Sequence, residues 1–280
     1  MRVPEPSAAP WTAPATSTPR AHLRPLSPGE ILDGAFTLYR RHFATFVATA
    51  LLARGPLIAM WAFFVAFGGD DVHAPGVDAL ARVLATLGLI VALGALTQQA
   101  SAAYLGQPVT VDAGLAAARR HFFSLSGVLI VQWLAMTVGM ILLVVPGLLA
   151  YAALFAVVPV VVLEKADAGR ALWRTRDLSR QALGRVLVVV ALLAVLTWLP
   201  VIAAPLLVGI GIGLAGGSGA APGLQELLIQ GVHAVTLPLQ AAGVVLLYYD
   251  RRVRTEALDL APPYAPLSHP ADAAPRAAAV

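Results

Sequence analysis

Residues 186–214 read VLVVVALLAVLTWLPVIAAPLLVGIGIGL, and no side chain in this stretch carries a charge. A helix rises about 1.5 Å per residue, so about 20 apolar residues cross the roughly 30 Å hydrocarbon core of a bilayer. Apolar stretches of this kind recur in the 280-residue chain, which is 59% hydrophobic and only 12% charged. A soluble domain has about 25% charged residues. The sequence therefore predicts an all-α, polytopic integral membrane protein.

Six transmembrane helices are predicted from the apolar stretches, and together they would form a six-helix bundle. Arg54-Gly55-Pro56 interrupts the first of them. A tight turn at Pro146-Gly147 is predicted to separate the third from the fourth. The predicted spans are residues 43–67, 80–105, 122–144, 148–163, 186–214 and 224–249.

An amphipathic cytosolic helix is predicted to precede transmembrane helices 1, 3 and 5. Ser27 with Glu30 three residues later is a capping box, which predicts the start of the first. Each of the three has an aspartate near its start and an arginine seven residues later, an order that the helix dipole favours. We interpret this as one unit, a basic helix plus a transmembrane hairpin, used three times; the alternative is independent reuse of acidic starts and basic ends. The pairs are Asp33 and Arg40, Asp112 and Arg119, and Asp167 and Arg174.

The basic residues near the predicted spans are concentrated on one side of the membrane. Arg82 is the only arginine or lysine expected near helix ends on the other side. Because loops rich in Lys and Arg stay in the cytosol, the basic side is assigned to the cytosol. An even number of spans then places both termini there.

Two Pro- and Ala-rich segments flank the predicted membrane domain. Residues 1–26 and 261–280 are predicted to be disordered cytosolic tails, since their composition cannot supply a packed core. The first segment has no apolar h-region, so a cleavable signal peptide is not expected. Residues 27–260 form the predicted six-helix membrane domain of three helix-hairpin units.

The composition argues against several functional classes. The chain has no cysteine, which excludes disulfides and thiolate metal sites. Its net charge of +4 does not indicate a nucleic-acid partner, because the basic residues flank the apolar stretches, where membrane orientation requires them. No catalytic grouping or phosphate-binding loop is recognisable. We therefore expect no enzyme activity, no cofactor and no metal site.

One arginine marks a candidate site inside the membrane. Arg54 falls about eleven residues into the first span, roughly 16 Å from its cytosolic end. An unpaired cation at that depth costs several kcal/mol. One interpretation is a polar cavity that binds a phosphate or carboxylate; the other is that Arg54 reaches the interface or pairs with glutamines for helix packing. The candidate residues are Arg54, Gln98, Gln132, Gln230 and His233.

A second candidate surface consists of arginines at the predicted cytosolic face. Lysine and arginine near a membrane attract the anionic lipids of the inner leaflet. The predicted partners are therefore membrane lipids with anionic headgroups, while the alternative is that these arginines only fix the topology. The sequence identifies no protein partner. The candidate contacts are Arg40, Arg41, Arg119, Arg120, Arg174, Arg176, Arg251 and Arg252.

Three motifs make the chain similar to a known family. Residues 24–33 read RPLSPGEILD, the Pro146-Gly147 turn is followed by PVVVLE at residues 159–164, and residues 247–260 read LYYDRRVRTEALDL. Over about residues 24–260, the sequence resembles the membrane domain of bacterial glycerophosphoryl diester phosphodiesterases. The resemblance is strongest to stand-alone actinobacterial membrane proteins of unknown function.

This resemblance implies a bacterial plasma-membrane protein linked to lipid or envelope metabolism. In fused relatives the membrane domain accompanies a catalytic barrel, whose His-Arg-Gly and acidic metal-binding motifs are absent from this sequence, so phosphodiesterase activity is not expected. The first hypothesis is a non-enzymatic structural, regulatory or accessory protein in lipid or envelope homeostasis. The alternative is a transporter or flippase that moves an anionic or amphipathic small molecule through a polar mid-membrane cavity.

Overall fold

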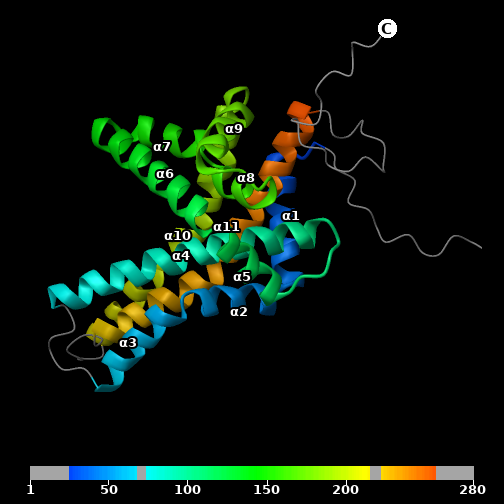
Figure 1. Ribbon diagram of the computed structural model, residues 1–280. Coiled ribbons are helices and arrows are strands. Elements are labelled where there is room, and N and C mark those ends of the chain that lie inside the picture. Colours follow the sequence, from blue (N-terminus) through cyan, green and yellow to red (C-terminus); the bar gives the residue numbers. More distant parts are fainter. Residues whose placement is uncertain (1–24, 68–73, 215–221, 257–280) are drawn as a thin grey trace, which may run out of the picture.

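A computed structural model describes residues 25–67, 74–214 and 222–256, and the regular elements within these ranges are all α-helices (Figure 1). The predicted tails lie outside the described residues, except for Pro25 and Leu26. Leu26 is half-buried, and its backbone is hydrogen bonded to the last turns of the final helix. Leu26, which was predicted to belong to the first tail, is therefore bound to the described helices.

Three short helices carry many of the basic residues, and each begins at a side-chain cap. Ser27 Oγ accepts the Glu30 N–H at 3.2 Å, and Glu30 Oε2 accepts the Ser27 N–H at 2.7 Å, which is the predicted capping box. Thr110 and Asp167 cap the other two helices through side-chain oxygens. Such caps satisfy N–H groups that have no partner within the helix, so they fix where it begins. The helices are α1 (Pro28–Arg41), α5 (Val111–Arg120) and α9 (Ala168–Arg180).

The longer helices are apolar enough to cross a membrane. Within the described ranges five segments qualify, with α7 and α8 counted as one, and α2 and α3 add a sixth if their pair, bent by 70°, is one span. The described part of the chain is therefore all-α, with five or six segments long enough for a membrane-embedded protein. The helices are α2 (Phe43–Ala53), α3 (Gly55–Phe67), α4 (Pro75–Tyr104), α6 (Phe122–Leu142), α7 (Val144–Ala153), α8 (Val157–Leu163), α10 (Leu183–Leu214) and α11 (Pro222–Glu256).

Helix α11 is the central element of the domain. It packs against α1, α2, α3, α4 and α10, while α6 and α7 form a hairpin that extends away from the group around α11 (Figure 1). Tyr248 of α11 is fully buried, as are Phe46 of α2 and Leu96 of α4. The described core is thus built around the last helix of the chain.

The α6–α7 hairpin presents a mostly apolar outer surface. Phe123 is 89% exposed, Ile141 78% and Leu143 70%. A contiguous apolar surface of this kind is unfavourable in water but not among lipid chains, which are themselves apolar. The outer surface of the hairpin therefore agrees with a position in a bilayer.

Two predicted boundaries differ from the structure. The chain reverses at Leu143, whose extended backbone (φ −168°, ψ 150°) ends α6, and not at Pro146-Gly147. Pro146 lies instead in the first turn of α7, where the missing N–H costs no helical hydrogen bond. The final helix does not end near Tyr249 but continues to Glu256, so part of the closing motif is helical.

Two glycines allow α6 and α7 to approach closely. A Cβ at Gly139 would lie 2.7 Å from the Cα of Gly147, which is nearer than unbonded atoms tolerate. Small residues commonly occupy such positions where membrane helices pack backbone to backbone. The hairpin therefore depends on glycine at this contact.

Gly139→Ala is expected to destabilise the fold by about 1–3 kcal/mol, because the added methyl must push two backbones apart. Gly209→Ala in α10 is the matched control, since a Cβ there meets no atom within 4 Å and alanine favours a helix more than glycine does. Thermal unfolding in detergent should show a lower melting temperature for the first variant and an equal or higher one for the second. Equal melting temperatures for both would contradict the close contact.

Candidate functional site

The bend between α2 and α3 places Arg54 inside the domain. The Arg54 backbone (φ −96°, ψ 1°) ends α2, and Pro56 follows in the first turn of α3. Proline cannot donate the hydrogen bond that would continue α2. Gly88 of α4 faces this break, and a Cβ there would lie 2.9 Å from the carbonyl oxygen of Ala53. The bend therefore packs directly against the backbone of α4.

Three of the five predicted mid-membrane residues lie at this bend. Arg54 is 5% exposed, and its Nε donates to Gln230 Oε1 of α11 at 3.1 Å, while a terminal guanidinium nitrogen donates to the same oxygen. His233 lies three residues further along α11, and residues at that spacing share a helix face. Its ring contacts Trp198 of α10, with 5.2 Å between ring centroids. The partner of the Arg54 guanidinium is the neutral amide of Gln230. It accepts hydrogen bonds from the Arg54 N–H groups but does not neutralise their positive charge.

Gln132, the fourth predicted residue, forms a hydrogen bond at a different helix break. Its Nε2 donates to the carbonyl oxygen of Leu154 at 3.1 Å, where α7 gives way to α8. Ser179 of α9 donates to the neighbouring Ala153 carbonyl oxygen at 3.0 Å. In a membrane, carbonyl groups freed at a break need partners from elsewhere in the protein. Gln132 therefore satisfies a backbone carbonyl group at the break between α7 and α8, and it is not part of the Arg54 site.

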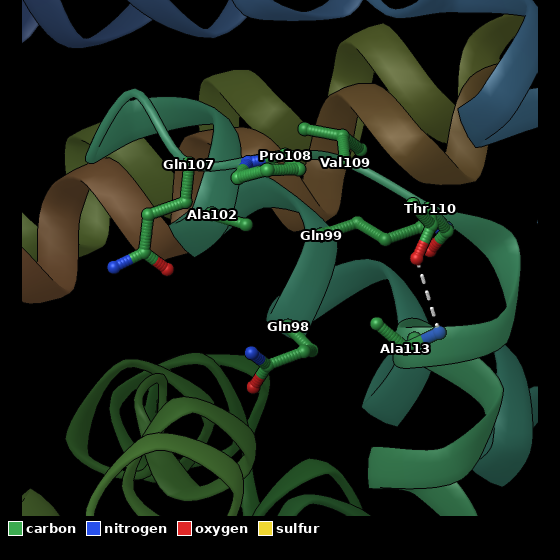
Figure 2. A pocket seen from close by; sticks show the side chains of 9 residues that line it. Gln98, Gln99, Ala102, Gln107, Pro108, Val109, Thr110 and Ala113 are labelled. Carbon is green, nitrogen blue, oxygen red and sulfur yellow. Dashed lines mark hydrogen bonds between the residues drawn. The ribbon is translucent and has the colours of Figure 1, made fainter. Parts of the chain in front are cut away.

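The fifth predicted residue, Gln98, lines a separate cavity of about 360 Å³ between α4 and α5 (Figure 2). Neutral amides, one hydroxyl and small apolar groups surround this space, so it has no charged lining residue. Gln98 is only half-buried. The lining residues are Gln98, Gln99, Ala102, Gln107, Pro108, Val109, Thr110, Ala113 and Gly114.

Gln99, the neighbour of Gln98, is the residue that is fixed at this cavity. Figure 2 shows the two side chains diverging from α4, with Gln99 directed toward Thr110. Gln99 is 1% exposed, and its Nε2 donates to Thr49 Oγ1 at 2.7 Å and to the Thr110 carbonyl oxygen at 3.0 Å. Gln99 thus ties α2, α4 and the start of α5 together. Gln99 lies on the buried face of α4, four residues after Ala95. This spacing in the sequence could have identified Gln99 as a buried polar residue.

A buried ionic network lies at the other end of α11. Glu164, directly after α8, pairs with Arg174 of α9 at 3.2 Å and accepts a hydrogen bond from the Tyr248 hydroxyl at 2.8 Å. Arg174 also contacts Glu256, and Arg252 pairs with the same carboxylate at 2.8 Å. The four charged side chains are at most 23% exposed. Buried charges are tolerated when they are paired. These ion pairs join the end of α8 to α9 and α11.

Asp250, whose side chain has no exposed surface, holds the beginning of the described chain. It accepts the Leu26 N–H at 2.7 Å and Arg254 Nε at 2.9 Å, and it pairs with Arg185 at 3.4 Å. The Leu26 carbonyl oxygen accepts hydrogen bonds from Arg254 at 3.0 Å and from Arg185. We call Asp250, Arg185 and Arg254 the Leu26 clamp, because they bind both polar backbone groups of that residue.

The predicted lipid-contacting arginines fall into two groups. Arg251 is 4% exposed and donates to the Leu178 carbonyl oxygen at 2.8 Å, and Arg252 is 9% exposed within the ionic network. Arg174, Arg251 and Arg252 were all expected to contact lipid headgroups. The structure instead gives them partners within the protein, because α11 continues as a helix and packs these residues against neighbouring segments. Arg176 is exposed, with its guanidinium carbon 5.7 Å from the Trp173 ring centroid. The exposed group consists of Arg40, Arg41, Arg119, Arg120 and Arg176.

Sequence reasoning missed the carboxylates that neutralise the buried arginines. The i, i+4 spacing of Asp250 with Arg254 and of Arg252 with Glu256 was the available signal, but it has meaning only if the helix continues beyond Tyr249. Within the described ranges, no group of three or more His, Asp and Glu side chains could hold a metal ion. No family model, no curated protein and no solved structure matches the chain.

Asp250→Asn is expected to lower the stability of the domain by about 3 kcal/mol, because it leaves Arg185 and Arg254 without their shared carboxylate. Asp177→Asn is the matched control, since Asp177 and its partner Arg180 are exposed and 3.8 Å apart. Thermal unfolding in detergent should show a clear drop for the first variant and little change for the second. If both variants melt like the wild type, the clamp contributes nothing to stability.

Proposed function

We propose that this chain is a non-enzymatic, multi-pass protein of the plasma membrane that binds anionic lipid headgroups at its cytosolic face. Its role would be structural, regulatory or accessory in lipid or envelope homeostasis. The observation that carries this proposal is the division of the arginines into a buried, paired group and an exposed group. The exposed group lies on the basic helices or at their ends, where the inner leaflet attracts positive charge.

The polar residues among the apolar helices also support a structural role. Arg54 with Gln230, and Gln132 with Leu154, each join segments where a helix is broken. A broken helix in a membrane is tolerated when neighbouring groups satisfy it. These contacts therefore have a sufficient explanation in packing.

The proposed topology has three units, each a basic helix followed by a transmembrane hairpin. Helix α1 precedes α2–α3 and α4, α5 precedes α6 and α7–α8, and α9 precedes α10 and α11. The rule that basic loops stay inside then places α1, α5, α9 and both termini in the cytosol. Membership of the glycerophosphoryl diester phosphodiesterase membrane domain family stays a prediction, carried by the sequence motifs alone.

Retention of anionic lipid tests this proposal. Replacing Arg40, Arg41, Arg119 and Arg120 together by Gln should lower the phosphatidylglycerol that copurifies with the protein by about tenfold or more, since each basic residue near a membrane contributes about 1 kcal/mol. Arg170 and Arg180 replaced together by Gln are the control, because these two exposed cations already have carboxylate partners. The measurement is native mass spectrometry of the detergent-purified protein. Equal retention by both variants would refute headgroup binding by the exposed group.

A transporter or flippase is the second candidate, favoured by Arg54, whose buried charge has a neutral amide as its partner. Proteoliposomes containing a fluorescent anionic lipid analogue distinguish the two. A transbilayer rate above that of protein-free liposomes, lost in Arg54→Gln, would favour transport. The structural role predicts no added rate, and a lower melting temperature for Gln230→Leu, because a buried donor without a partner costs about 1–3 kcal/mol. Gln225→Leu, at an exposed position of α11, is the control.

A further inference from the structure

The cavity between α4 and α5 combines exposed and buried lining residues (Figure 2). Pro108 and Ala113 of its lining are exposed, while Ala102 and Gly114 are buried. Its volume of about 360 Å³ lies within the range of pockets that hold small molecules. A small molecule can therefore enter from the surface and contact groups of the interior.

Gln99 brings an acceptor without a partner to this cavity. Its amide nitrogen donates to Thr49 Oγ1 and to the Thr110 carbonyl oxygen. Because a carbonyl oxygen can only accept, the nitrogen must face it, and this fixes the orientation of the Gln99 amide. Within the described ranges Gln99 Oε1 has no hydrogen-bond partner, although the residue is only 1% exposed. A buried acceptor in this state is unfavourable, so a molecule in the cavity that donates to Oε1 would gain affinity.

The lining disfavours charged and purely apolar occupants. Neither an acid nor a base is among the lining residues. A phosphate or ammonium group inside the cavity would lose water without gaining an opposite charge. An acyl chain would leave the Gln99 acceptor unsatisfied. The remaining class of occupant is a neutral molecule that carries hydrogen-bond donors.

The other polar groups of the lining narrow this class to a polyol. The side chains of Gln98, Gln107 and Thr110 stand around the same space (Figure 2). Each amide offers a donor and an acceptor, and the Thr110 hydroxyl, which accepts the Ala113 N–H at 3.3 Å, still has its own hydrogen to donate. A hydroxyl group likewise both donates and accepts. Two or more neighbouring hydroxyl groups on one neutral molecule therefore match the lining.

The position of the cavity along α4 suits the headgroup of a lipid. Gln99 lies about 8 Å before the end of α4 at Tyr104, and the basic helix α5 follows. In the proposed topology this is the cytosolic end of a membrane helix, close to the level of the headgroups. The hydroxyl groups can therefore come from a polyol headgroup, such as that of phosphatidylglycerol, or from a free polyol such as glycerol.

We propose that the cavity between α4 and α5 is a binding site for a neutral polyol group, with Gln99 Oε1 as its buried acceptor. The lipid as a source of this group rests on the proposed function and deepens it. The exposed arginines would attract the charge of a headgroup, whereas this cavity would select the headgroup by its hydroxyl groups.

Retention of two matched lipids tests the site. Phosphatidylglycerol and phosphatidylethanol carry the same phosphodiester charge, but the ethyl headgroup has no hydroxyl group. In native mass spectrometry of the detergent-purified protein, the wild type should retain phosphatidylglycerol about tenfold more, the effect of roughly two hydrogen bonds. Ala113→Leu, which fills the cavity from an exposed position of α5, should retain the two lipids equally. Ala62→Leu, at an exposed position of α3 that does not line the cavity, is the control and should keep the preference.

The opposite results separate this inference from the proposed function. Equal retention of the two lipids by the wild type would overturn the polyol site, while a preference for phosphatidylglycerol over phosphatidylcholine would leave the proposed function standing. A preference that Ala113→Leu keeps would also overturn the site. If Ala113→Leu fails to fold, Gln98→Leu decides, because it removes a half-buried lining amide and should lower the preference.

A large excess of free glycerol distinguishes the two sources of the polyol. Loss of the wild-type preference in its presence would show that the free polyol occupies the same cavity. An undiminished preference would assign the site to the lipid headgroup.

Discussion

The described fold depends on a carboxylate that has no contact with solvent. Asp250 is tolerated in the interior because the Leu26 N–H, Arg185 and Arg254 surround it. The same two arginines bind the Leu26 carbonyl oxygen, so the chain before α1 cannot leave α11 without stranding a buried acid and two bases. One short stretch of α11 thereby holds the start of α1 and the start of α10 at the same end of the domain.

This constraint explains why arginines that look alike in the sequence differ in the structure. Arg251 and Arg252 continue a helix whose preceding residues are the core, and they remain inside because carbonyl and carboxylate oxygens of other segments meet them. Arg119 and Arg120 end a ten-residue helix that buries Gly114 and Ala117, and they face outward. Position relative to the core, and not the residue type, decides which cations are available to a ligand.

Much of the architecture could be predicted because its causes are local. The capping box at Ser27 fixes the start of α1, and Pro56 ends α2, within a few residues of sequence. The extension of α11 to Glu256 could not be predicted, because its last turns look like a polar segment beyond a membrane helix until Glu164 and Arg174 are placed beside them. For the same reason, five polar residues assigned to one mid-membrane site are divided among two helix breaks and a separate cavity.

The helix breaks themselves account for the polar residues of the interior. Where α2 ends at Arg54, Gln230 supplies the acceptor, and where α7 ends, Gln132 and Ser179 supply donors to freed carbonyl groups. A membrane offers no water for these groups, so each break requires a polar side chain from another helix. Exposed charges such as those of Arg119 and Arg120 have no such duty, because water or headgroups can solvate them.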